Sequence, residues 1–192
     1  MCPMKRTPLT IEWSLLGLIH QQPMHGYELH QRLSNAEGLG LVWRLKQSQL
    51  YALLSRLEAR GYLSATLESQ EPRPPRKVFS LTTSGRDAFL EWVQSPVSRG
   101  RDFRMEFLAK LYFAHLEGKT TVQHLLERQR EACQNWKAAQ EAEADTSREA
   151  APYQWLVYQF RIGQMQAMLD WLDTCEQTLF NLTPEDRENE PS

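Results

Sequence analysis

The sequence predicts a mainly α-helical protein with a small β-hairpin wing: an N-terminal winged helix-turn-helix followed by a C-terminal helical dimerisation region. Three observations support this prediction. The hydrophobic period changes from 3.6 residues to 2 and back to 3.6 within residues 9–95. A polar, proline-rich segment separates the two alternating runs. Beyond residue 101 the pattern is helical throughout, so the chain divides into a mixed N-terminal part and an all-helical C-terminal part.

Three helices are expected before the first strand. The first begins near Thr10 and ends before Pro23, which cannot continue a helix. The second covers roughly 26–36, and a loop with two glycines follows over 37–46. The third covers 48–60 and stops at Gly61. Its apolar stripe consists of Leu50, Leu53, Leu54 and Leu57.

A β-hairpin is expected next. Residues 62–67 and 77–81 alternate as strands, and the loop 68–76 between them is polar and contains three prolines. Thr82 then caps a fourth helix, which ends before Pro96. The hairpin therefore forms a protruding wing with basic residues near its tip.

The remaining chain predicts helices over about 102–117, 120–148 and 153–180. Pro152 suits the start of the last helix, because its missing N–H is not needed there. That helix has a heptad-like apolar seam, which we interpret as a dimerisation face. The seam consists of Trp155, Tyr158, Ile162, Met165, Leu169 and Leu172.

These patterns give three expected regions: a DNA-binding winged helix over 1–95, an all-helical dimerisation and effector region over 96–182, and a disordered acidic tail over 183–192. Residues 1–100 contain 12 Lys and Arg against 8 Asp and Glu, whereas residues 101–192 contain 10 against 16. A basic half joined to an acidic half suits a nucleic-acid-binding module fused to a protein-facing one. The three cysteines lack close spacing and no apolar run is long enough for a membrane span, so a cytoplasmic location is expected.

The third helix is the expected reading element, because the second helix of a helix-turn-helix lies in the major groove of DNA. Residues off its apolar stripe are candidates for DNA contact: Ser48, Gln49, Tyr51, Ser55 and Arg56. Gln matches the adenine edge and Arg the guanine edge, while Ser and Tyr suit phosphate oxygens. The wing adds Arg73, Arg76 and Lys77. The alternative for the helix is an ordinary solvated face.

Four segments resemble the PadR family of bacterial transcriptional regulators. They are Leu15-Leu16-Gly17-Leu18-Ile19, Pro23-Met24-His25-Gly26-Tyr27-Glu28-Leu29, the run from Leu50-Tyr51 to Tyr62-Leu63, and the run from Pro75-Arg76-Lys77 to Ser84-Gly85-Arg86. The resemblance covers about residues 9–95 well and extends more loosely into the C-terminal helices. It implies a homodimer, paired through the C-terminal helices, that regulates transcription from a two-fold operator, with repression favoured. Tyr27 joins the DNA-binding candidates, since its ring can pack while its hydroxyl reaches phosphate.

Two departures from the family pattern concern the reading helix. The family usually has Gly-Ser before the Leu-Tyr pair and Pro just after it, whereas this chain has Ser48-Gln49 and Ala52. Gln49 thus places a base-reading amide where a hydroxyl is common, so the family's operator preference is not transferred. The resemblance also allows a pocket for a flat hydrophobic or aromatic effector, for which Phe103, Phe107, Trp155 and Tyr158 are candidates. The alternative is that these aromatic residues only pack.

No catalytic function is predicted. The sequence has no phosphate loop, nucleophile elbow or paired-carboxylate motif, and its histidines and cysteines lack metal-ligand spacing. We therefore expect no enzyme activity, no metal and no cofactor. Two alternatives remain at this stage. One is a regulator of another winged-helix family, such as the MarR-like proteins, and the other is a winged helix that acts only as a protein-interaction adaptor without specific DNA binding.

Overall fold

The computed structural model describes residues 9–35, 38–42, 45–70, 73–148 and 151–181. For residues 69, 70, 73–75 and 181 it describes the backbone and not the side chains. The chain divides into two compact units. The first contains Met1–Val93 together with Leu108–Phe113, and the second contains Gln94–Phe107 and Ala114–Ser192. The acidic tail expected at 183–192 lies outside the described residues.

The first unit is a winged helix, which confirms the fold class. Its helices are α1 (Thr10–Gln21), α2 (Gly26–Ser34), α3 (Gln47–Ala59) and α4 (Thr83–Gln94), with a 3-10 turn over Gly38–Leu41. Its core is made of leucines and aromatic rings from all four helices. The fully buried side chains among them are Leu15, Leu16, Leu29, Leu33, Leu50, Leu54, Leu57 and Phe89.

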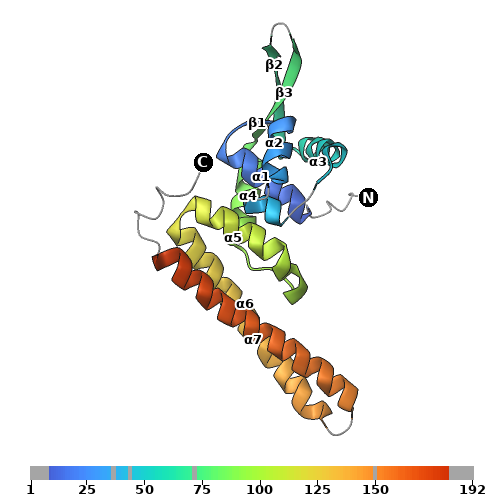
Figure 1. Ribbon diagram of the computed structural model, residues 1–192, viewed down its shortest axis with the longest axis vertical. Helices are drawn as coiled ribbons and strands as arrows, with labels where there is room; N and C mark the ends of the chain where they lie inside the picture. Colours follow the sequence, from blue (N-terminus) through green and yellow to red (C-terminus); the bar gives the residue numbers. More distant parts are fainter. Residues whose placement is uncertain (1–8, 36–37, 43–44, 71–72, 149–150, 182–192) are drawn as a thin grey trace. The chain divides into compact units, whose positions relative to one another are not determined.

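The wing is the hairpin of β2 (Leu63–Gln70) and β3 (Arg73–Leu81), which extends away from the helices in Figure 1. Both strands are longer than the alternating runs predicted. A third strand, β1 (Met24–His25), pairs antiparallel with β3, giving the order β1-β3-β2. A strand of two residues is too short to show alternation, so the sequence could not predict it.

The base of the wing is fixed to α4 by the predicted cap. The Thr82 hydroxyl accepts a hydrogen bond from the backbone N–H of Gly85 at 3.0 Å and donates one to the carbonyl of Gly61 at 2.6 Å. The first bond satisfies an orphan donor of α4, and the second joins the end of β3 to the turn after α3. One threonine thus connects the helix-turn-helix, the wing and the following helix.

A segment of α5 (Glu106–Glu117) completes the core of the winged-helix unit. The Phe113 ring packs edge-on against Phe89, with centroids 5.4 Å apart. Lys110 is only 1% exposed, and its ammonium donates to the backbone carbonyl of Trp92 at 2.9 Å while lying 5.0 Å from that indole. A fragment ending at residue 95 would therefore lack part of this core.

The second unit is built on a long antiparallel hairpin of α6 (Lys119–Ser147) and α7 (Pro152–Asn181), visible in Figure 1. The helix expected over about 102–117 is divided into a 3-10 helix, η2 (Gly100–Arg104), and α5, which begins at Glu106. The segment before η2 is held to α6 by a buried hydrogen bond. The side-chain carbonyl of Gln129, on α6, accepts from the backbone N–H of Val97 at 2.8 Å. Among the described residues, no helix is long and apolar enough to cross a membrane.

An ion-pair cluster and two buried thiols hold α6 against α7. Arg130 donates to Asp173 at 2.8 Å and to Glu176 at 2.7 Å, and these bonds, that to Asp173 first, raise the pKa of the guanidinium above its ordinary value. Cys133 and Cys175 are both buried as free thiols. Burial raises the pKa of Cys133 and brings that of Cys175 to about 11, so both stay neutral at physiological pH.

Candidate nucleic-acid interface

One face of α3 is polar and exposed to solvent. The stripe Leu50, Leu53, Leu54 and Leu57 is buried, as predicted from the helical period. The side chains on the other side are exposed, and they include every candidate named on this helix: Ser48, Gln49, Tyr51, Ser55 and Arg56. This face presents amides, hydroxyls and a guanidinium to solvent, which are the groups that hydrogen-bond base edges and phosphates.

Gln49 has a structural role as well as a free amide. Its Oε1 accepts a hydrogen bond from the backbone N–H of Lys46 at 3.2 Å, so the side chain closes the first turn of α3. The Nε2 group remains as a donor. Lys46 itself is exposed immediately before the helix, where a cation can reach a phosphate, and the sequence reasoning did not name it.

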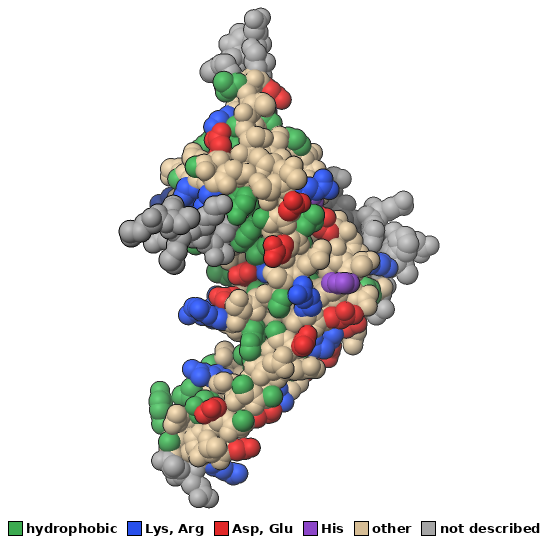
Figure 2. Space-filling model, turned by 180° about the vertical axis from the view of Figure 1, so that it is seen from behind, with side chains coloured by type: hydrophobic (Ala, Val, Ile, Leu, Met, Phe, Trp, Pro, Cys, Tyr) green, Lys and Arg blue, Asp and Glu red, His purple; other side chains and the backbone are tan. Residues whose placement is uncertain are grey.

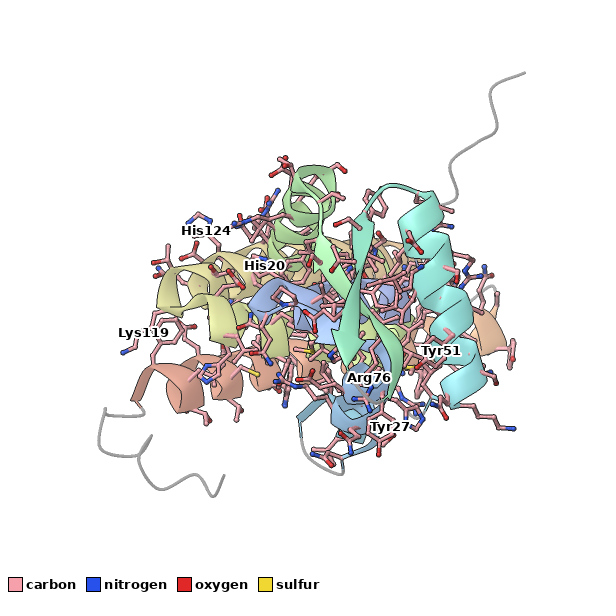
Figure 3. All side chains as sticks on the ribbon, turned by 90° about the horizontal axis from the view of Figure 1, so that it is seen from above. His20, Tyr27, Tyr51, Arg76, Lys119 and His124 are labelled. Atoms are coloured by element: carbon pink, nitrogen blue, oxygen red, sulfur yellow. The ribbon has the colours of Figure 1, made fainter. Side chains whose placement is uncertain are left out.

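Tyr51 is positioned by the start of α2. A Cβ added at Gly26 would lie 2.6 Å from the Tyr51 ring, so a glycine here gives room for this ring beside the start of α2. Tyr51 is 43% exposed and Tyr27 is 57% exposed. Tyr27 accepts a hydrogen bond from Gln31 on its hydroxyl at 3.2 Å. Figure 3 shows Tyr27, Tyr51 and Arg76 on one side of the winged-helix unit, from α2, α3 and β3.

A buried carboxylate anchors α3 to α1. Glu12 is fully buried, and its Oε2 accepts from Arg60 at 3.3 Å and from the backbone N–H of Leu9 at 2.7 Å. Its Oε1 lies 3.1 Å from Nε of Arg56, although the geometry is that of a charge contact and not of a hydrogen bond. Arg56, named as a base-reading candidate, thus also contacts the carboxylate that joins α3 to α1. Sequence reasoning missed Glu12 and Arg60, which are 48 residues apart in the chain.

The wing contributes two described basic side chains. Arg76 is exposed and pairs in register with Glu68. Lys77 donates to Glu58 of α3 at 2.7 Å and lies 5.4 Å from the Phe79 ring, so it joins the wing to α3. The side chain of Arg73 lies outside the described residues.

The dimerisation candidates on α7 differ in exposure. Met165 and Leu172 are buried inside the single chain, whereas Trp155, Tyr158, Ile162 and Leu169 are half-buried. The seam therefore lies partly within the α6–α7 hairpin. The most exposed apolar side chains of α7 lie on its opposite face: Tyr153 (81%), Leu156 (58%) and Phe160 (66%).

The effector candidates are not brought together in one place. Phe103 and Phe107 stack with centroids 4.4 Å apart and pack edge-on against Trp171, as part of a buried aromatic cluster. Trp155 lies 16 residues earlier on α7, a separation of about 24 Å along a helix. Its ring contacts Arg148 at 5.9 Å. Within the described part of the chain, no group of three or more His, Cys, Asp or Glu could hold a metal ion.

Comparison with known proteins gives a separate family match for each part of the chain. Residues 15–91 match the model of the transcriptional regulator PadR-like family, and residues 103–179 match that of the virulence activator alpha C-terminal family. The negative transcriptional regulator PadR of Bacillus subtilis (strain 168) is 27% identical over 103 residues, which is 54% of this chain and 56% of that protein. A probable transcriptional regulator of Mycobacterium tuberculosis is 25% identical over 187 residues, covering 89% of this chain and 98% of that protein.

Solved structures include similar chains. The crystal structure of Bacillus subtilis PadR in complex with operator DNA is 20% identical, with 89% of this chain and 99% of that chain covered and a TM-score of 0.45. These solved structures support the winged-helix fold alone, and the family likeness depends on the sequence matches. Residues 15–91 are thus a region of the transcriptional regulator PadR-like type.

Proposed function

We propose that this regulator binds a two-fold operator in double-stranded DNA as a homodimer, with α3 in the major groove and the wing against the backbone. The observation that supports this most directly is the exposed polar face of α3, held rigid by Glu12 below it and flanked by the wing. Base reading is assigned to Gln49 and Arg56, and phosphate contact to Ser48, Tyr51, Ser55, Tyr27, Arg73, Arg76 and Lys77. Repression is the proposed outcome because the similar Bacillus subtilis PadR is a negative transcriptional regulator.

The test of base reading uses two substitutions at Gln49. Gln49→Ala removes the amide and the cap, whereas Gln49→Glu keeps an acceptor for the Lys46 N–H and replaces the amide donor by a carboxylate. The added negative charge of Gln49→Glu weakens binding to all DNA sequences alike, so only the change in base preference reports on the lost donor. We expect both variants to lose preference at the same operator base pair, by about 1–3 kcal/mol as for one bidentate contact. Selection from a randomised DNA pool measures this preference. Thermal unfolding measures the contribution of the cap, because only Gln49→Ala should lower the stability of the protein. An unchanged preference profile in both variants would show that Gln49 does not read bases.

Contacts between the wing and the DNA backbone should strengthen binding to all DNA sequences alike. We expect Arg76→Ala to weaken operator and random DNA equally and to lower the slope of log affinity against log salt by about one. Arg86→Ala is the matched control, because Arg86 is exposed on α4 and not among the proposed contacts. Fluorescence anisotropy with labelled duplexes at several salt concentrations gives both slopes. If the full-length protein showed no salt-dependent DNA binding at all, the adaptor alternative would hold instead.

Dimerisation is proposed through α7. Tyr153, Leu156 and Phe160 recur at steps of three and four residues, so they share one face of the helix, and exposed Gly163 and Ala167 continue it. Figure 2 shows hydrophobic side chains gathered on the surface at the end of the hairpin near the α6–α7 connection. We propose that the same face of a second copy covers this stripe. The half-buried residues of the predicted seam would add to the interface at its edges. A contiguous apolar stripe of this kind is costly to leave in water.

A further inference from the structure

A groove in the second unit has no role in DNA binding or dimerisation as proposed above. It lies between η2 with the residues just before it, α6 and α7, and its volume is about 880 Å³. That is at the upper end of the 300–1,000 Å³ typical of pockets for small organic ligands. None of the four aromatic residues proposed from the sequence as an effector pocket lines it.

The charged lining of the groove has one sign. Arg99, Arg101, Arg104 and Arg161 line it, and no Asp or Glu does. Within the described part of the chain, Arg99 and Arg104 form no ion pair, and Arg101 only reaches its neighbour Asp102 at 3.8 Å. Arg161 donates to the side-chain carbonyl of Gln140 at 3.3 Å, and Gln140 lines the groove as well. Four guanidinium groups around one concave site repel each other unless an anion lies among them.

The floor of the groove is apolar. Trp136 of α6 and Met165 and Met168 of α7 line it. Gly100 lets the 3-10 turn lie close to this floor, since a Cβ there would be 2.8 Å from the Met165 methyl group. An indole offers a flat surface for stacking, and methionine side chains adapt to irregular shapes. The groove thus combines a cationic rim with an adaptable apolar base.

We propose that this groove binds a small organic anion with at least two negative charges and an apolar, preferably flat, group. The charges meet the guanidinium rim, where planar forks match carboxylate or phosphate oxygens, and the apolar group lies on Trp136 and the methionines. A monoanion would leave most of the rim unmatched, and a neutral compound all of it. That such a ligand regulates DNA binding rests on the proposed function. Binding of the ligand to the groove does not depend on it.

The test measures binding to the full-length protein without DNA, by isothermal titration calorimetry at low salt. The probes share a naphthalene ring and differ in charge: 2-naphthalenemethanol, 2-naphthoate, naphthalene-2,6-dicarboxylate and 2-naphthyl phosphate. We expect the two dianions to bind at least tenfold more tightly than 2-naphthoate, and the alcohol to show no binding. Comparison of the two dianions identifies whether carboxylate or phosphate is preferred. Raised salt should weaken the dianions most.

Variants assign the binding to the groove. Arg99→Gln with Arg104→Gln should weaken dianion binding at least tenfold, and Trp136→Ala should weaken every charged probe. Arg86→Gln, which removes an exposed arginine of the other unit, should bind like the unchanged protein. Equal affinity for the alcohol and the dianions, or unchanged dianion binding in the double arginine variant, would overturn the proposal. A protein that binds the dianions but no DNA would contradict the proposed function while leaving the groove intact.

Discussion

Replacing Glu12 by alanine is expected to destabilise the winged-helix unit by about 2–3 kcal/mol and to abolish measurable operator binding. Removing one partner of a buried ion pair typically costs 3–5 kcal/mol. The lower figure applies because the Arg56 and Arg60 side chains are 51% and 29% exposed and regain hydration once the carboxylate is gone. For a unit of roughly 100 residues this lowers the melting temperature by about 10–20 °C.

The expected loss of DNA binding follows from the position of the contacts. Glu12 lies on α1 and contacts the chain that enters this helix at Leu9. It also contacts Arg56 and Arg60 at the C-terminal end of α3, the proposed reading helix. Without the carboxylate, α3 keeps its leucine stripe but loses the charged contacts that fix its rotation and tilt. Differential scanning calorimetry measures the stability, and anisotropy well below the melting temperature of the variant measures operator affinity.

Three further variants separate anchoring from base reading. Glu12→Gln keeps the side-chain volume and an acceptor for the Leu9 N–H, and removes only the negative charge. Any loss of stability or operator affinity that Glu12→Gln shares with Glu12→Ala is therefore due to that charge. A double-mutant cycle of Glu12→Gln with Arg56→Gln should show a coupling energy, whereas Ser55→Ala on the same face should not couple to Glu12. A Glu12→Gln protein as stable as the unchanged one, with full operator affinity, would refute the anchoring role.

The fold was predictable because its signals are local. The leucines of α3 recur with the helical period, Thr82 precedes its helix as a cap does, and Pro152 begins α7 as expected. Each of these features depends on residues within one or two turns. The same reasoning located the exposed face of α3, since burying one stripe leaves the other side to solvent.

The contacts that give the site its rigidity were not predictable in this way. Glu12 meets Arg60 across 48 positions of the chain, and Lys77 meets Glu58 across 19, so only the packing of α1, α3 and the wing brings them together. The same holds for the groove, where Arg161 joins arginines some 60 residues earlier.

A heptad-like seam also does not specify its partner. The pattern on α7 predicts an apolar interface, but part of it is buried in the chain's own hairpin, at Met165 and Leu172. Leu156 and Phe160 are among the residues left exposed on the opposite face. The strongest hydrophobic period of the sequence does not include them. An interface between copies must therefore be sought on what remains uncovered in one chain.

Charges placed on that exposed face should separate the two copies. We expect Leu156→Glu with Phe160→Glu to convert a dimer into a monomer at micromolar concentration, because two carboxylates from each copy would meet at the two-fold interface. Both side chains are more than half exposed, so the fold of the single chain should be unaffected, with unchanged circular dichroism. Affinity for an operator with two half-sites about 34 Å apart should fall at least a hundredfold, whereas affinity for a single half-site should not change.

A matched control adds the same charges elsewhere. Gln134→Glu with Asn135→Asp introduces two carboxylates at exposed positions of α6, away from the stripe on α7. Sedimentation velocity of both double variants compares charge alone with charge on the proposed interface, and the control should stay dimeric. If Leu156→Glu with Phe160→Glu also sedimented as a dimer and bound the two-half-site operator normally, the copies would have to pair through another surface. If both double variants became monomeric, the effect would be one of net charge, and the stripe on α7 would lose its assigned role.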